Sequence, residues 1–257
     1  MNIEHLKRVR AVVGNELLII LDCFMSLSVP YAIDLVQRIS KEVPGGVMCL
    51  EEIMMPQAYD EMAEVKAKVG HLVQFSTGEH EYGLRAFKSI LEKKCADMIQ
   101  PNITVCGGLT EARRICSLAR AFDIPVIFHG SSSFSYHIQF ALKSCPYGEL
   151  LLVCPEASTI SPLFGNLFLD EPLPVNGYIR LPNKPGFGLT LNKENIFVRP
   201  CERTREWVEK TLRLPLLSLR SLDSSALAQC AHKKIQPHPF TALRQRRVGA
   251  LSHRVSG

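Results

Sequence analysis

The stretch from Leu18 to Glu79 contains three apolar runs that each end in a carboxylate. They are LIILD, ending at Asp22, VMCLEE, ending at Glu51 and Glu52, and VQFSTGE, ending at Glu79. The intervals between the terminal acids, 29 and 28 residues, are about the length of one strand followed by one helix. This stretch therefore predicts consecutive β/α units whose strands each present an acid at the carboxyl end.

The same repeat continues beyond Glu79. DMIQPN ends at Asn102, VIFHG carries His129, and LLLVCPE ends at Glu156, so six strand-like runs recur at intervals of 23 to 29 residues. Amphipathic segments at 58–69 and 110–121 lie between the runs, and no hairpin signal joins them. Such alternation predicts parallel strands in a (β/α) barrel, whose sites lie where the strands end. Six units are fewer than the eight that close this barrel, so we expect an incomplete barrel or an open sheet.

The element boundaries follow from apolar periodicity and from Gly and Pro positions. We expect strands at 16–23, 47–52, 72–77, 96–100, 125–128 and 150–153, and helices at 2–12, 31–43, 58–69, 84–94, 110–121 and 136–143. We further expect three regions: a partial barrel over 1–166, a Pro- and Gly-rich wrapping segment over 167–200, and a tail over 201–257. In the tail a short helix at 202–212 is expected, with the remainder disordered.

Composition is that of a soluble globular protein. Of 257 residues, 46% are hydrophobic, no apolar run reaches 18 residues, and the charged amino terminus lacks a hydrophobic signal segment. These features predict a cytoplasmic protein that does not enter a membrane. The nine cysteines include no CxxC pair, which favours buried thiols in a reducing compartment over disulfides or zinc.

The positive charge is concentrated in the tail. Residues 201–257 hold eleven Lys or Arg against four acids, so the net charge of +5 leaves −2 for the first 200 residues. Single-stranded nucleic acid sites interleave cations with aromatic residues, and the tail has only Trp207 and Phe240 as aromatics. We therefore expect no nucleic acid partner.

Asp22, Glu51 and Glu79 end successive strands, so in a barrel they would converge at one rim. Like charges that close repel one another unless a cation lies among them, and a set of oxygen ligands favours Mg²⁺ over zinc. The alternative is that they are ordinary acids paired with Lys or Arg. Because adjacent strand residues point to opposite faces, only one of Glu51 and Glu52 can face the site, and alternation does not choose between them.

His129 ends a strand two units beyond Glu79. A histidine beside a Mg²⁺ site suits general acid or base chemistry, since its pKa lies near neutrality. The alternative is a histidine whose ring is satisfied by backbone groups. His80, beside Glu79, and Glu149, near the start of the sixth strand, are weaker candidates.

These residues lie in sequence blocks that resemble the enolase superfamily in its mandelate racemase and muconate lactonizing branch. The blocks are LDCFMS, CLEEIMMPQAY, STGEHEYG, MIQPNITVCGGLTEA, VIFHGSSSFSYH and LDEPLPVNG, and together they resemble the L-rhamnonate dehydratase family. The resemblance covers roughly residues 2–200 and does not extend into the tail.

The resemblance implies an enolase-type barrel and a Mg²⁺-dependent dehydration of an acid sugar to a 2-keto-3-deoxy acid. Asp22, Glu51 and Glu79 match the family's metal ligands, with Glu51 as the member of the paired acids that binds. His129 matches the acid or base, Glu149 a polar group opposite it, and His80 a site histidine.

Two departures from the family pattern favour an alternative, a non-catalytic or truncated relative that keeps the metal carboxylates. The family's QPD motif reads QPN here, so Asn102 replaces the Asp that orients the histidine. The amino-terminal capping domain and two preceding barrel strands have no counterpart in this sequence, which predicts open edges at 17–23 and 150–153. We expect a homo-oligomer, or a partner chain, to cover that gap.

Overall fold

The computed structural model describes residues 2–130, 132–152 and 159–194. Its sheet has four parallel strands in the order β1 (Ile20–Asp22), β2 (Cys49–Glu51), β3 (Gln74–Thr77) and β4 (Met98–Ile99). A parallel bridge between Ile99 and Val126 extends the sheet by one position in the next unit. The predicted parallel β/α architecture is therefore confirmed.

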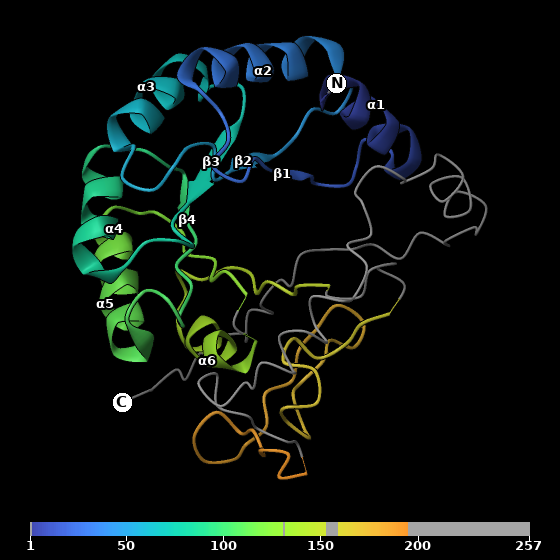
Figure 1. Ribbon diagram of the computed structural model, residues 1–257, viewed down its shortest axis with the longest axis vertical. Coiled ribbons are helices and arrows are strands. Elements are labelled where there is room, and N and C mark those ends of the chain that lie inside the picture. Colours follow the sequence, from blue (N-terminus) through green and yellow to red (C-terminus); the bar gives the residue numbers. More distant parts are fainter. Residues whose placement is uncertain (1, 131, 153–158, 195–257) are drawn as a thin grey trace, which may run out of the picture.

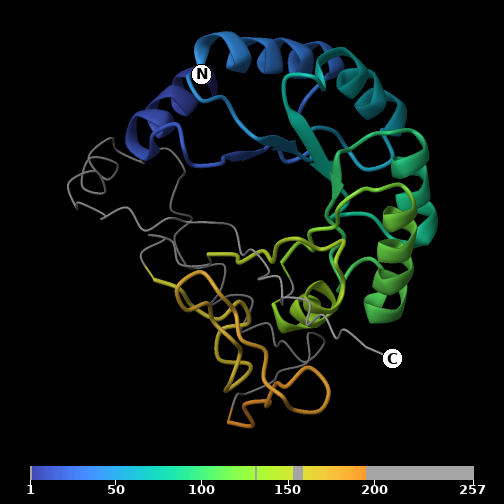
Figure 2. The same cartoon turned by 180° about the vertical axis from the view of Figure 1, so that it is seen from behind.

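Helices cover the strands from one side. They are α1 (Asn2–Val13), α2 (Val29–Glu42), α3 (Tyr59–Val69), α4 (Gly83–Glu92), α5 (Gly108–Ala121) and α6 (Ser133–Ala141). In both views α1 to α5 form an outer arc around the strands, which is the outline of a partial barrel (Figures 1 and 2). Within the described residues, no helix is long and apolar enough to cross a bilayer.

Helix α2 illustrates how the sequence specifies this arrangement. Ser28 precedes the helix and a proline occupies its first turn, where a missing N–H costs no hydrogen bond. Ala32, Leu35, Val36 and Ile39, spaced three or four residues apart, are all buried. Together with the strand residue Leu50 they belong to a core that lies between the sheet and the arc of helices.

Two turns at the amino-terminal end of the barrel are joined by one buried cation. Arg10, on α1, is 6% exposed and donates to the carbonyl oxygens of Gly14, Leu17, Gly45 and Gly46 at 2.6 to 3.1 Å. Five bonds from one guanidinium satisfy a charge that would otherwise be costly to bury. Arg10 thereby fixes the chain before β1 against the chain before β2.

Some predicted strands are shorter than expected. The run at 16–23 is a strand only over Ile20–Asp22, the run at 125–128 contributes only the bridge at Val126, and residues 150–152 have no strand. A strand forms only where a neighbour supplies backbone partners, and β1 pairs with β2 alone in the described sheet. Leu18 and Ile20, at this edge, are 66% and 40% exposed.

Residues 159–194 form no helix or strand and pack against α6. Phe134 on α6 makes edge-to-face contacts with Phe164, Phe168 and Phe187, whose ring centroids lie 4.8 to 6.2 Å away. Inside the segment, an antiparallel bridge joins Phe168 to Leu191. The predicted boundaries at 166 and 200 stay predictions, and the expected helix and disorder after residue 200 lie outside the described residues.

The expectation of buried thiols is confirmed for the described residues. Six cysteines there are buried and take part in no disulfide: Cys23, Cys49, Cys95, Cys106, Cys116 and Cys145. Burial raises the pKa of the Cys49 thiol to about 12, which keeps it protonated and unreactive at neutral pH.

Candidate metal and acid–base site

The predicted carboxylates lie at or just after the carboxyl ends of neighbouring strands. Asp22 and Glu51 are the last residues of β1 and β2 and are direct partners in the parallel register. Glu51 in turn aligns with Ser76 on β3, and Glu79 follows that strand by two residues. In-register parallel strands thus bring acids from three units, far apart in sequence, to one rim of the partial barrel.

The turn that carries Glu79 depends on Gly78 and Glu52. Gly78 has φ of +125°, a conformation that side chains rarely adopt, and a Cβ there would lie 2.9 Å from Phe87. Glu52 is 2% exposed, and its Oε1 accepts hydrogen bonds from the Thr77 hydroxyl at 2.9 Å and the Gly78 N–H at 2.7 Å. Glu52 therefore holds the Thr77–Gly78 peptide, one residue before Glu79.

Glu51 lies in a strongly negative environment. Burial, followed by the charges of Glu149 and Asp22, raises the pKa of Glu51 to about 7, and the charge of Glu79 adds to the effect. Gln100 lowers the pKa of Glu51, against this rise, because its Nε2 donates a hydrogen bond to Glu51 Oε1 at 2.6 Å. Sequence reasoning missed Gln100, although its place in the QPN block was the available signal.

His129 connects this acidic rim to the next unit. Its backbone N–H donates to the Pro101 carbonyl at 3.2 Å, which places the residue after the bridge at Val126. The ring Nε2 lies 2.9 Å from Glu79 Oε2. That hydrogen bond, with the charges of Glu149, Glu79 and Glu51, raises the pKa of His129 against the opposing effect of burial.

The second ring nitrogen of His129, Nδ1, contacts Asn102. Asn102 Oδ1 accepts the backbone N–H of Thr104 at 2.9 Å and its hydroxyl at 2.6 Å. A backbone N–H can only donate, so this contact fixes the orientation of the amide and directs Nδ2 toward His129 Nδ1, 3.2 Å away. Nδ1 must then accept, and the proton of a neutral His129 lies on Nε2, facing Glu79.

Glu149 and His80 border the same rim. Glu149 Oε2 accepts a hydrogen bond from the Gly130 N–H, directly after His129. Burial raises the pKa of Glu149 despite that bond. His80 Nδ1 lies 3.4 Å from Glu79 Oε1 and 3.7 Å from Glu52 Oε2, and its ring packs edge-on against Phe24.

The carboxylates do not form a closed cage. Among the described residues, no group of three or more His, Cys, Asp or Glu side chains is arranged to hold a metal ion. Each acid has its own partner: Asp22 accepts from the Phe24 N–H at 2.8 Å, Glu51 from Gln100, and Glu79 from His129. The donor chemistry nevertheless fits Mg²⁺, because the acids offer only oxygens. Burial, with the charges of Asp22 and Glu79 adding to it, raises the pKa of Glu51.

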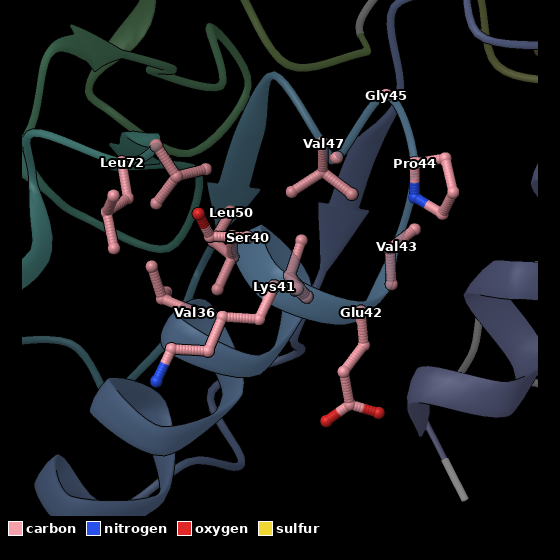
Figure 3. Close-up of a pocket in the computed structure, with 13 residues that line it drawn as sticks. Val36, Ser40, Lys41, Glu42, Val43, Pro44, Gly45, Val47, Leu50 and Leu72 are labelled. Atoms are coloured by element: carbon pink, nitrogen blue, oxygen red, sulfur yellow. The ribbon is translucent and has the colours of Figure 1, made fainter.

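A cavity lies away from this rim. A pocket of about 420 Å³ opens at the opposite end of β2, between the end of α2 and the turn at 43–47. It is lined by Val36, Val47 and Leu50 and also by Lys41 and Glu42 (Figure 3). Because parallel β/α folds build sites where strands end, we place the functional site at the acidic rim rather than in this cavity.

Comparison with known protein families agrees with this geometry. Residues 1–195 match the model of the family described as enolase C-terminal domain-like. The chain belongs to the enolase superfamily. It is 39% identical over 201 residues to an L-rhamnonate dehydratase of Saccharopolyspora erythraea, a match that covers 78% of this chain and 51% of that protein.

Solved structures of the superfamily support the same assignment. A rhamnonate dehydratase from Gibberella zeae, crystallised with Mg, is 40% identical and superposes with a TM-score of 0.71, covering 75% of this chain and 47% of that one. An L-talarate dehydratase from Polaromonas sp. JS666, crystallised with Mg and L-glucarate, is 21% identical with a TM-score of 0.64, which shows a shared fold. The chain spans about half the length of these relatives.

Proposed function

We propose that this chain is a Mg²⁺-dependent acid-sugar dehydratase of the L-rhamnonate dehydratase type. The observation that carries the proposal is the convergence of Asp22, Glu51, Glu79 and His129 at one rim of an enolase-type sheet. Identity of about 40% to L-rhamnonate dehydratases adds support. The reaction is loss of water from the acid sugar, which yields a 2-keto-3-deoxy acid.

Asp22, Glu51 and Glu79 are the side chains that would hold the metal. Mg²⁺, when bound, supplies positive charge beside the substrate carboxylate and so makes the neighbouring C–H more acidic. Gln100 donates to Glu51 and fixes the direction of its oxygens. Glu79 accepts a hydrogen bond from His129 and would also be a ligand of the metal, so it would link the cation site to the proton-transfer group.

His129 is the acid or base of the proposal. In the tautomer that Asn102 selects, its Nε2 carries a proton and is suited to donate it to a departing hydroxyl. Glu149, bonded to the adjacent Gly130 N–H, stands near His129 and favours the charged imidazolium. His80 adds a second ring beside Glu79 and is our candidate for contact with substrate hydroxyls.

Product formation tests the proposal directly. The purified chain is incubated with MgCl₂ and a panel of acid sugars that includes L-rhamnonate, and 2-keto-3-deoxy acids are quantified. We expect product from at least one sugar, and none when EDTA replaces MgCl₂. No product from any sugar would refute the dehydratase assignment.

A specific observation favours a second candidate, a non-catalytic relative that retains the metal carboxylates. The Asn102 amide donates to His129 Nδ1, and this leaves no lone pair on Nε2 with which to remove a proton. An amide also cannot stabilise an imidazolium as a carboxylate does. Under this candidate the chain binds Mg²⁺ but converts no sugar, a combination that the same assay with parallel calorimetry would reveal.

The exposed edge of β1 favours the binding of a partner chain there. Leu18 and Ile20 are 66% and 40% exposed beside a strand that pairs on one side only within the described sheet. We propose that a second copy of the chain, or another chain, covers this edge. Light scattering coupled to size exclusion should therefore give a mass above 28.7 kDa, and a stable monomer would contradict the proposal.

A further inference from the structure

We propose that Glu52 is a positioning residue that aims Glu79 at the metal site by holding the turn before it. The inference rests on the proposed function, since it assigns Glu79 to the metal. Glu52 follows Glu51 directly, and regular strand geometry would turn its side chain to the opposite face. In this structure it reaches across to the next unit and bonds two consecutive residues, Thr77 and Gly78.

The backbone at Glu52 departs from a strand in the way this contact requires. Its φ is +45°, in the left-handed region that a residue with a side chain rarely occupies and that costs on the order of 1 kcal/mol or more. The strain is held by backbone bonds on both sides: Glu52 N–H donates to Ser76, and its carbonyl accepts from Met25. Three consecutive units are thereby joined at one residue.

Because Glu52 is buried, the loss of its hydrogen bonds would leave a polar group unpaired away from water. The side chain is 2% exposed, so its oxygen must be paired within the protein, and the Thr77 hydroxyl and Gly78 N–H provide that pairing. Gly78 cannot shift without cost, because Phe87 lies close on its other side. The Gly78 carbonyl also accepts the Glu81 N–H at 3.2 Å, which fixes the turn beyond Glu79.

The direction of Glu79 follows from this fixed turn. With the N–H of Gly78 held by Glu52 and its carbonyl by the Glu81 N–H, the Glu79 side chain extends toward His129. Groups that orient a metal ligand in this way typically change metal affinity by about 10- to 100-fold when removed. Glu52 thus acts on the metal through Glu79, without binding it.

Calorimetric titration of the full chain with MgCl₂ tests the role of Glu52. We expect Glu52→Gln to raise the Kd for Mg²⁺ by about 10- to 100-fold, because the neutral amide is a weaker acceptor for Thr77 and Gly78. Glu171→Gln is the matched control: Glu171 is also buried and accepts backbone N–H groups, from Leu163 and Phe164, but it lies in the 159–194 segment. Glu171→Gln should bind Mg²⁺ with the same Kd as the parent, even if both variants melt at a lower temperature than the parent.

A second pair of variants keeps the inference testable if Glu52→Gln does not fold. Thr77→Val removes only the hydroxyl that donates to Glu52 and should weaken Mg²⁺ binding, whereas Thr77→Ser retains the donor and should restore it. Parent-like affinity in Glu52→Gln or in Thr77→Val would overturn the role of Glu52 and leave the metal site intact. A parent chain that binds no Mg²⁺ would overturn both this role and the proposed function.

Discussion

Replacing Asn102 with Asp should convert His129 into a competent base. In the parent, Asn102 Nδ2 donates to His129 Nδ1, and the proton of the neutral ring is held on Nε2. A carboxylate at position 102 can keep both bonds from Thr104, since each of them needs only an acceptor. Its second oxygen would accept a hydrogen bond from Nδ1–H, so the neutral ring would carry its proton on Nδ1 and its free lone pair on Nε2, on the site side.

The size of the effect follows from what the exchange restores. General acid or base catalysis contributes about 10²- to 10⁴-fold in rate. The reverse change, Asp to Asn beside the histidine of a serine protease, costs about 10⁴-fold. We therefore expect Asn102→Asp to raise kcat at least about 100-fold, equivalent to roughly 3 kcal/mol of activation free energy. KM should change little, because Asn102 contacts the Nδ1 side of the ring, opposite the Nε2 that faces Glu79.

The assay is release of 2-keto-3-deoxy acid from L-rhamnonate with saturating Mg²⁺, comparing parent and variant. Asn192→Asp is the control: it adds the same charge to an amide that likewise accepts a nearby backbone N–H, from Glu194, but in the 159–194 segment. Its rate should match that of the parent. A folded, Mg²⁺-binding Asn102→Asp chain no faster than the parent would refute the tautomer argument.

Three further predictions concern stability. Arg10→Met should lower the free energy of unfolding in urea by about 3 kcal/mol, because four backbone carbonyls lose the charged donor that joins them, and a change below about 0.5 kcal/mol would contradict this role. Gly78→Ala should cost about 1 to 3 kcal/mol through its positive φ and its approach to Phe87, and should also weaken Mg²⁺ binding; an unchanged melting temperature and Kd would argue against the turn geometry. Mg²⁺ at 100 times its Kd should raise the free energy of unfolding of the parent by about 2.7 kcal/mol. The same Mg²⁺ concentration should stabilise Glu79→Gln by much less. Identical melting curves of the parent in MgCl₂ and in EDTA would exclude binding.

The parallel β/α order was predictable because it rests on periodic features. Apolar runs at near-constant intervals, each followed by a helical pattern, leave parallel pairing as the natural arrangement. The positions of Asp22 and Glu51 follow from the same periodicity, since the last residues of adjacent parallel strands lie side by side. Strand lengths were less predictable: β1 and the run at 125–128 depend on neighbours, which a local pattern does not report.

The contacts within the site depend on geometry that residue patterns do not encode. Strand alternation could not choose between Glu51 and Glu52, and the reason is now visible: Glu52 leaves the β region altogether, so both acids serve the rim from adjacent positions. The orientation of the Asn102 amide depends on Thr104, and nothing in the QPN motif specifies that bond. Gln100 was likewise missed, because its role appears only once β4 lies beside β3 and its side chain reaches Glu51 on β2.

The central claim is that Asp22, Glu51 and Glu79 share one divalent cation. Crystals of the chain soaked in Mn²⁺, a spectroscopic substitute for Mg²⁺, would show the ion by its anomalous scattering. We expect a single strong peak at about 2.0 to 2.3 Å from an oxygen of each of the three side chains. A map without a peak among them, or with the ion bound only at another place on the chain, would contradict the account.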